Sequence, residues 1–152
     1  MKQLSLILIV LFSLSGFSQK ENKRLSQFNL EKNSAIQGYD PVAYFKQAKA
    51  IKGKKEIKVT HEGVVYFFSS VANKDLFVKS PTKFEPQYGG WCAYAMGNAN
   101  EKVAINPETF KIVNGKLYLF YNAYFNNTLK SWNKEESVLM TKADANWIKI
   151  LK

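Results

Sequence analysis

The stretch FKIVNGKLYLF, residues 110–120, predicts local structure more clearly than any other part of this chain. Asn114-Gly115 is a dipeptide that the tight type I′ turn favours, because both central residues of that turn have positive φ. The flanking residues alternate in a way that is typical of two antiparallel strands. We therefore expect a β-hairpin. The residues predicted to share its inner face are Phe110, Ile112, Leu117 and Leu119.

A second hairpin is predicted nearer the N-terminus. Residues 57–61 and 64–68 are strand-like, and Glu62-Gly63 between them is a turn signal. A two-residue turn pairs opposite side chains on one face of the hairpin. The predicted pairs are His61 with Val64, Val59 with Tyr66, and Ile57 with Phe68. The only histidine in the sequence would then lie at the turn end of the more apolar face.

Short helices are predicted around these hairpins. Asp40 is placed to cap a helix that begins at Pro41 and covers residues 42–45. The residues 69–70 are serines that can cap a helix running to about residue 79, with Val71, Leu76 and Phe77 on its apolar side. Residues 91–96 are expected to form a helix that Gly97 ends. Residues 122–152 are expected to form one or two helices. The predicted fold class is α+β, a small single domain with two β-hairpins packed among short helices.

The first eighteen residues are typical of an export signal. A lysine at position 2 precedes an apolar run from Leu4 to Leu14, and small residues follow at the expected cleavage site. The apolar run is shorter than the roughly 20 residues that span a bilayer. We expect a signal peptide over residues 1–18, a flexible spacer over 19–33 and the folded domain over 34–152. The expected location is periplasmic or secreted, with no stable membrane insertion.

The chain is strongly basic, with a formal net charge of +10. Its lysines are scattered along the sequence, apart from one cluster between Lys49 and Lys58. We do not expect nucleic acid as a partner, because an exported protein rarely meets it. The charge instead favours solubility and a loose attraction to anionic surfaces.

Several segments together resemble the exported, single-domain YHS-domain proteins. The resemblance extends from Ile36 to Trp147. It rests on GYDPVAYF (38–45), GVVYFFS (63–69), NKDLF (73–77), PTKF (81–84), PQYGGWCA (86–93), GKLYL (115–119) and ADANW (143–147). The most specific of these is PQYGGWCA. The resemblance implies a small treble-clef-like core, here followed by C-terminal helices, and a role in metal handling or beside oxygenase components.

This sequence also departs from that family pattern. Residues 68–70 are Phe-Ser-Ser where such a domain places a cysteine, and Cys92 is the only cysteine in the chain. A structural zinc site needs four protein ligands, usually Cys and His. With one residue of each kind, a closed zinc site is not expected.

Cys92 is the first candidate site residue. If a helix begins at Trp91, then Cys92 and Met96 are four residues apart and share a face. With His61 added, they would form a soft ligand set that suits Cu(I). We therefore predict an exported binding protein that handles a transition metal, copper before zinc. Two alternatives stay open: Cys92 is a small buried core residue with Met96 filling space beside it, or it is a reactive thiol.

The second candidate is a set of aromatic residues. They come from the segments that carry the resemblance, and they could line a pocket for a small ligand. The set comprises Tyr39, Tyr44, Tyr66, Tyr88, Trp91 and Tyr94, with Asp40 beside them. The alternative is that these side chains pack the core and that Asp40 only caps a helix. A module that binds a small ligand or a protein partner is therefore the alternative function. Enzyme activity is not predicted, since no motif ties Cys92 to a base.

Overall fold

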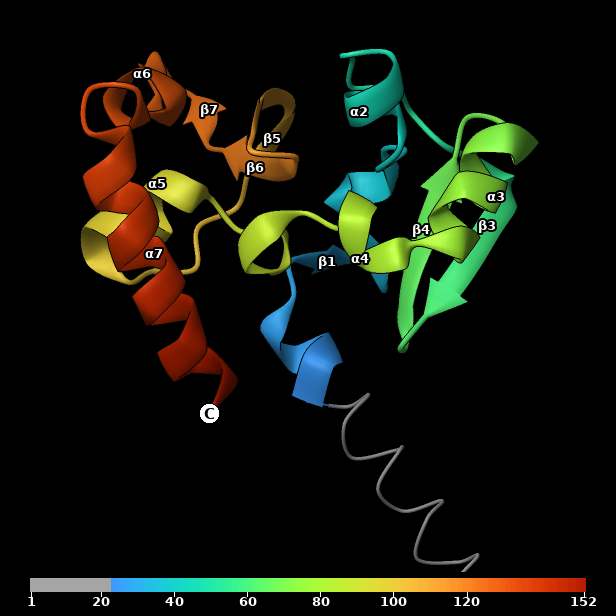
Figure 1. Cartoon of the computed structure of the whole chain (residues 1–152), viewed down its shortest axis with the longest axis horizontal. Helices are drawn as coiled ribbons and strands as arrows, with labels where there is room; N and C mark the ends of the chain where they lie inside the picture. The colour runs from blue at the N-terminus through green and yellow to red at the C-terminus, as the bar shows by residue number, and fades with distance from the viewer. Residues whose placement is uncertain (1–22) are drawn as a thin grey trace, which may run out of the picture.

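Hairpins and short helices make up residues 23–152, the part of the chain that the computed structural model describes (Figure 1). The α+β class predicted from the sequence is confirmed. The predicted signal peptide and the first residues of the predicted spacer, 19–22, lie outside the described residues. Between residues 23 and 152, no helix combines the length and the apolar character needed to cross a membrane.

The first sheet has the strand order β1-β2-β4-β3. Its strands are β1 (Leu30–Glu31), β2 (Ser34–Ala35), β3 (Lys54–His61) and β4 (Val64–Phe68). Strand β2 pairs with β4 in parallel, and the hairpin β3–β4 is antiparallel. The predicted pairs of His61 with Val64 and of Val59 with Tyr66 are confirmed. The predicted pair of Ile57 with Phe68 is wrong, because the register shifts and Lys54 pairs with Phe68 instead.

The second hairpin joins β5 (Asn106–Val113) to β6 (Lys116–Phe120). Phe110 pairs with Leu119 and Ile112 with Leu117, in agreement with the predicted inner face of this hairpin. Strand β6 is buried on both faces, which its alternating pattern did not indicate. Leu117 and Leu119 face one cluster of the core, whereas Tyr118 and Phe120 belong to another. This strand therefore joins the two halves of the hydrophobic interior.

The remaining elements are short, except for the last helix. They are η1 (Ile36–Gly38), α2 (Ala43–Lys46), α3 (Val71–Lys79), α4 (Pro81–Phe84), η2 (Gln87–Gly90), α5 (Ala93–Ala99), β7 (Asn122–Ala123), β8 (Asn126–Asn127), α6 (Thr128–Trp132) and α7 (Glu136–Leu151). The cap predicted at Ser70 is present. Helix α2 begins later than predicted, with Val42 as its N-cap, but Asp40 still accepts hydrogen bonds from the backbone N–H groups of Val42 and Ala43. The predicted apolar side of α3 is partly wrong, because Val71 is exposed and Asn73 and Phe77 are the buried residues.

Helix α5 begins and ends later than predicted. Cys92 has a non-helical ψ of 117° and is the N-cap, so the first helical residue is Ala93 and not Trp91. The helix continues through Gly97 to Ala99, and its C-cap is Asn100, which has positive φ. Gly97 is needed inside the helix because a Cβ there would lie 2.4 Å from the carbonyl oxygen of Leu139 in α7. This glycine permits a close crossing of α5 and α7 rather than a helix end.

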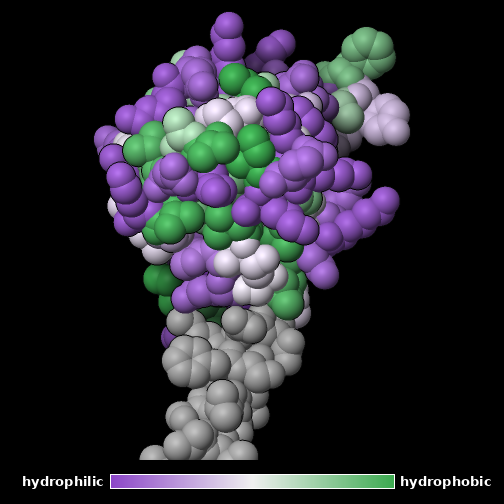
Figure 2. Space-filling view, turned by 90° about the vertical axis from the view of Figure 1, so that its right-hand side faces the viewer, coloured by the Kyte–Doolittle hydropathy of each residue, from purple (hydrophilic) through white to green (hydrophobic). Residues whose placement is uncertain are grey.

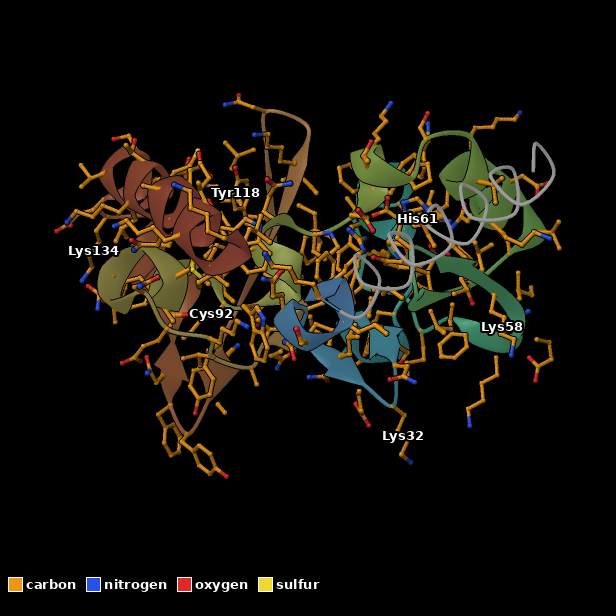
Figure 3. All side chains as sticks on the ribbon, turned by 90° about the horizontal axis from the view of Figure 1, so that it is seen from below. Lys32, Lys58, His61, Cys92, Tyr118 and Lys134 are labelled. Carbon is orange, nitrogen blue, oxygen red and sulfur yellow. The ribbon has the colours of Figure 1, made fainter. Side chains whose placement is uncertain are left out.

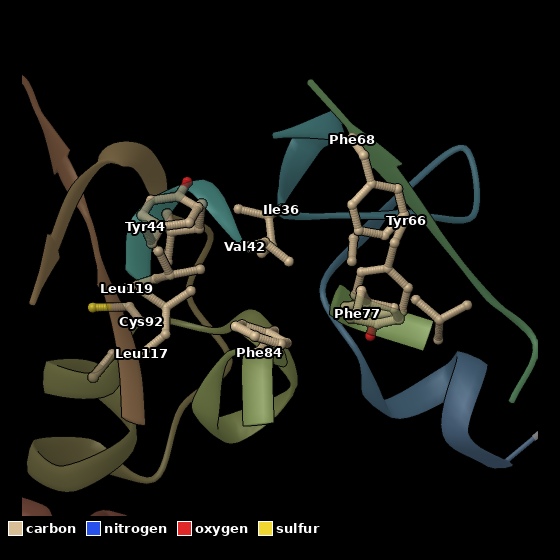
Figure 4. Packing of buried hydrophobic residues seen from close by; sticks show 14 residues of the cluster. Ile36, Val42, Tyr44, Tyr66, Phe68, Phe77, Phe84, Cys92, Leu117 and Leu119 are labelled. Carbon is tan, nitrogen blue, oxygen red and sulfur yellow. The ribbon is translucent and has the colours of Figure 1, made fainter. Parts of the chain in front are cut away.

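The core consists of two clusters. The first contains residues of α2, β4, α3 and β6, with Cys92 among them (Figure 4). Phe77 lies against Tyr66 and Phe68, with ring centroids 4.6 and 5.2 Å apart. The second cluster lies under α7, where Trp132 contacts Tyr118 and Phe120. Helix α7 and strand β6 thus close the second half of the domain.

Residues 23–33, predicted to be part of a spacer, instead pack on the domain. Residues 23–27 are helical. Asn29 donates from its backbone N–H to the carbonyl oxygen of Gly89, and its side chain donates to the carbonyl oxygen of Gly90. Leu25, Phe28 and Leu30 contact the first cluster. The sequence predicted a spacer because most residues of this segment are polar, but its few apolar residues pack against the core.

Candidate functional site

The predicted copper ligand Cys92 is fully buried. Its Sγ accepts a hydrogen bond from the backbone N–H of Tyr121 at 3.3 Å and lies 3.4 Å from Oγ1 of Thr128. It belongs to the first core cluster, beside Leu117 and Leu119. These surroundings are those of a small core side chain.

The two predicted co-ligands do not join Cys92. His61 is half-buried in β3, with its ring edge-on to Phe77 at a centroid distance of 6.1 Å. Figure 3 shows His61 and Cys92 on separate parts of the molecule. Met96 is buried in the second core cluster. Within residues 23–152, no three His, Cys, Asp or Glu side chains are close enough to hold a metal ion. The structure therefore does not bring the predicted set together, because Cys92 and Met96 belong to different core clusters and His61 lies at the end of β3.

The predicted aromatic set does not converge on one pocket either. Tyr44 is buried and donates from its hydroxyl to the carbonyl oxygen of Pro107 at 2.9 Å. Tyr39 packs under the ammonium group of Lys52, which lies 4.6 Å from the ring centroid. Tyr94 lines a small cavity of about 300 Å³ next to Cys92. These side chains occupy different places in the fold, so the structure does not bring the predicted set together around one pocket.

Asp40, placed beside that set, has a structural role. Its carboxylate is completely buried. Oδ1 accepts from the backbone N–H groups of Val42 and Ala43. Oδ2 accepts from Ser69, through both its N–H and its hydroxyl, and from the Asn73 side chain at 2.7 Å. One carboxylate therefore ties the start of α2 to the turn between β4 and α3.

A larger cavity than the one beside Cys92 lies elsewhere, between residues 23–28, η2 and α7. Its volume is about 650 Å³. Small-molecule sites typically measure about 300 to 1,000 Å³. The apolar lining is provided by Phe28, Pro86, Trp147, Ile148 and Leu151, with Tyr88 and Gly89. We call this hollow the η2 cleft.

Gly89 brings the two aromatic walls of the η2 cleft together. It has a φ of +60°, and a Cβ at this position would lie 3.0 Å from Cη2 of Trp147 and 3.1 Å from Cδ2 of Phe28. The rings of Phe28 and Trp147 meet edge to face, with centroids 6.3 Å apart. Glycine is thus required twice here, for its backbone conformation and for the absence of a side chain.

Tyr88 is the member of the predicted aromatic set that lines the cleft. Its hydroxyl donates to Oδ1 of Asp144 at 2.9 Å. Burial of the ring, reinforced by this carboxylate, raises the pKa of the Tyr88 hydroxyl above its ordinary value. Tyr88 therefore stays a neutral hydrogen-bond donor throughout the physiological pH range.

Arg24 lines the wall of the η2 cleft that residues 23–28 form. Its guanidinium lies 4.2 Å from the centroid of the Phe28 ring. It is paired with Glu62 at 3.3 Å and with Glu85, which also accepts from the Tyr66 hydroxyl at 2.6 Å. Burial of Tyr66, with Glu85 next to it, raises the pKa of that hydroxyl. The Nε of Arg24 is buried and has no hydrogen-bond partner within the described part of the chain.

The charges around the η2 cleft are balanced. Three cationic and three carboxylate side chains line it, namely Lys23, Arg24, Lys116, Glu62, Glu85 and Asp144. Arg24 is neutralised by its two partners, whereas Lys23, Lys116 and Asp144 are exposed. A flat apolar floor with exposed charges of both signs at its rim suits a small ligand with an apolar body and a polar head.

Only some of the cleft residues that the sequence analysis missed carry a sequence signal. Asp144, Trp147, Ile148 and Leu151 follow the i, i+3, i+4, i+7 spacing of one helix face. That spacing in a C-terminal helix could have identified this wall. Arg24 and Phe28 lie in the segment predicted to be a spacer, and nothing in their local sequence indicates a contact with η2.

Comparisons of the chain with protein-family models, with curated proteins and with solved structures give no match. The resemblance to YHS-domain proteins accordingly stays a prediction that rests on the motifs quoted above. Copper binding stays a prediction as well, and the geometry supplies Cys92 with neither of its expected co-ligands.

Proposed function

We propose that this protein is an exported binding protein that holds a small ligand in the η2 cleft. The ligand has a flat apolar body, bound against the wall that Phe28 and Trp147 form, and a polar head that reaches the rim of the cleft. The observation that carries the proposal is a hollow of about 650 Å³ whose floor is the aromatic-lined turn of η2. The export part rests on residues 1–18, which lie outside the described residues.

The shape of the cleft supports a flat ligand. Aromatic side chains pack well against planar apolar groups and lose little conformational entropy, since the rings are already held. Gly89 holds the rings of Phe28 and Trp147 close to its backbone in the absence of ligand. Such a preformed wall lowers the free-energy cost of ordering the site on binding.

The polar groups support a head with both donors and acceptors. Asp144 accepts one hydrogen bond among the described contacts, from Tyr88. Lys23 and Lys116 provide cationic donors at the same rim. Because the lining charges cancel, a zwitterionic head is matched better than a head with one net charge.

Calorimetry with three phenyl compounds tests the proposal on the purified protein. Phenylalanine, phenethylamine and phenylacetate share the flat ring and carry a zwitterionic, a cationic and an anionic head, respectively. We expect saturable binding, with phenylalanine the tightest of the three. Trp147→Leu, which keeps apolar volume but removes the flat ring, should weaken binding by about tenfold, or 1.4 kcal/mol.

Tyr39→Leu is the matched control, since it removes a half-buried aromatic ring outside the η2 cleft. It should leave the affinity unchanged. A second variant, Asp144→Asn, removes the charge of an exposed rim residue but keeps an oxygen that can accept from Tyr88, and it should narrow the preference for phenylalanine over phenylacetate. Absence of saturable binding for all three compounds, or equal weakening by Trp147→Leu and Tyr39→Leu, would refute the proposal.

A further inference from the structure

The turn of the hairpin β7–β8 consists of two aromatic residues whose side chains do not pack in the core. Asn122 pairs with Asn127 and Ala123 with Asn126, so Tyr124 and Phe125 form a two-residue turn. The relative exposures of these two side chains are 92% and 112%. No other large hydrophobic residue in the described part of the chain exceeds 57%. We call this turn the aromatic tip.

The two residues of the aromatic tip have a backbone conformation that is unfavourable for bulky side chains. Tyr124 has a φ of +49° and Phe125 a φ of +63°. A two-residue turn with both φ values positive favours Asn and Gly, because a bulky side chain is crowded in that conformation. The hairpin β5–β6 of the same chain uses Asn114-Gly115 for this turn. The aromatic tip thus combines an unfavourable backbone conformation with full exposure of two aromatic side chains. Neither feature stabilises the folded domain.

The base of the tip is held firmly. The side chain of Asn122 donates to Oγ1 of Thr109 at 3.0 Å. Thr128 donates to the carbonyl oxygen of Tyr121 through both its N–H and its hydroxyl. Asn127 caps α6 by accepting from the N–H of Leu129. The two aromatic side chains are therefore presented on a rigid support, as a binding element requires.

The net charge of the chain and the lysines that follow the tip in the sequence favour an anionic partner surface. Residues 121–134, which form the tip hairpin and α6, include the exposed Lys130 and Lys134 and no Asp or Glu; the exposed Glu135 follows, and Glu101 lines a cavity together with Asn126 of the hairpin. The whole chain carries a net charge of +10. Phe inserts into an apolar layer, and Tyr prefers the level where apolar and polar layers meet. Lysines near the surface add attraction to anionic lipids.

We propose that the aromatic tip docks this protein on the interface of an anionic phospholipid membrane. Phe125 and Tyr124 enter the headgroup region, and Lys130 and Lys134 lie against the lipid phosphates. Contact of this kind is peripheral and reversible, because two side chains enter and no helix spans the bilayer. This docking is independent of the η2 cleft, which is built from other elements.

Co-sedimentation with vesicles of phosphatidylglycerol and phosphatidylcholine tests the proposal. The key variant is Tyr124→Asn/Phe125→Gly, which copies the turn of β5–β6. It should bind the vesicles about tenfold more weakly, because two aromatic anchors are lost. Its melting temperature should equal or exceed that of the wild-type protein, because the new residues fit the turn. A folding defect therefore does not explain the loss.

Val71→Asn/Val78→Asn is the matched control for removing exposed apolar side chains. Both residues are 55% exposed on α3. Helix α3 lies on the side of the molecule viewed in Figure 2, where hydrophobic groups alternate with hydrophilic ones. This control should bind vesicles like the wild-type protein. Lys130→Gln/Lys134→Gln should weaken binding to the anionic vesicles, and added salt should remove that difference.

A tryptophan at the tip reports insertion directly. In Phe125→Trp, emission should shift to the blue on vesicle addition and should be quenched by brominated lipid, relative to the wild-type protein. Wild-type binding by Tyr124→Asn/Phe125→Gly would overturn the proposal. So would self-association that depends on the tip without vesicle binding, since that outcome identifies a second copy of the chain as the occupant.

Discussion

At the scale of single residues, Cys92 illustrates how a rare side chain is used for packing. The thiol is completely buried and accepts a hydrogen bond from the N–H of Tyr121. Removal of an acceptor from a buried N–H costs about 1 to 3 kcal/mol. Cys92→Ala should therefore lower the free energy of unfolding by that amount in a urea titration. Cys92→Ser should lower it less, since a hydroxyl restores the acceptor.

The reactivity of the same thiol gives a second measurement of its role. A thiol reagent should modify Cys92 slowly in the native protein and rapidly in urea, because reaction requires opening of the core. Rapid native reaction that Cu(I) prevents would contradict this expectation. It would also revive the copper hypothesis.

Asp40 shows that the type of a residue alone does not reveal its structural role. The sequence placed it both at a helix cap and beside a ligand pocket, and the structure uses its carboxylate for five hydrogen bonds inside the core. The cap could be predicted because it depends on residues two and three positions along the chain. The bonds to Ser69 and Asn73 could not, since they depend on the tertiary arrangement of α2 and α3.

At the scale of elements, Gly97 fixes the distance between α5 and α7. A Cβ there would lie 2.4 Å from the Leu139 carbonyl oxygen, which is backbone and cannot rotate away. Gly97→Ala should therefore destabilise the protein by about 2 kcal/mol or more, despite the better helix propensity of alanine. Thermal unfolding followed by circular dichroism measures this effect.

Gly115→Ala provides a comparison for Gly97→Ala. Gly115 has a φ of +71°, and nothing lies within 4 Å of a Cβ added there. This substitution carries the backbone penalty of a positive φ alone, about 1 kcal/mol. Equal or smaller destabilisation by Gly97→Ala would mean that α5 and α7 separate easily, which contradicts a close crossing.

The elements that were predicted correctly are those with local signals. Asn114-Gly115 and Glu62-Gly63 mark their hairpins, and the register near each turn follows from the turn itself. The error at Ile57 arises farther from the turn, where an irregularity shifts the pairing. The η2 cleft could not be predicted, because Arg24, Tyr88 and Trp147 are brought together only by tertiary packing.

At the scale of the whole molecule, the buried tyrosines predict how stability depends on pH. Burial raises the pKa of the hydroxyls of Tyr44, Tyr66 and Tyr88 above the ordinary value. Above about pH 10 the unfolded chain loses these protons while the folded chain keeps them. The folded state then binds more protons, so the free energy of unfolding falls as pH rises. Below about pH 10 both states are protonated, and this contribution is constant.

We therefore expect a steep alkaline loss of stability, to which each deeply buried tyrosine contributes up to about 1.4 kcal/mol per pH unit. Urea titrations at several pH values above 9 measure the slope. Tyr44→Phe removes one hydroxyl and one hydrogen bond, so the protein should be less stable near neutral pH but should show a shallower alkaline slope. Tyr124→Phe is the control, because its side chain is exposed in the folded protein and should not alter the slope. An unchanged slope in Tyr44→Phe would mean that this hydroxyl ionises equally easily in the folded and unfolded protein, so that the loss of stability must come from other groups.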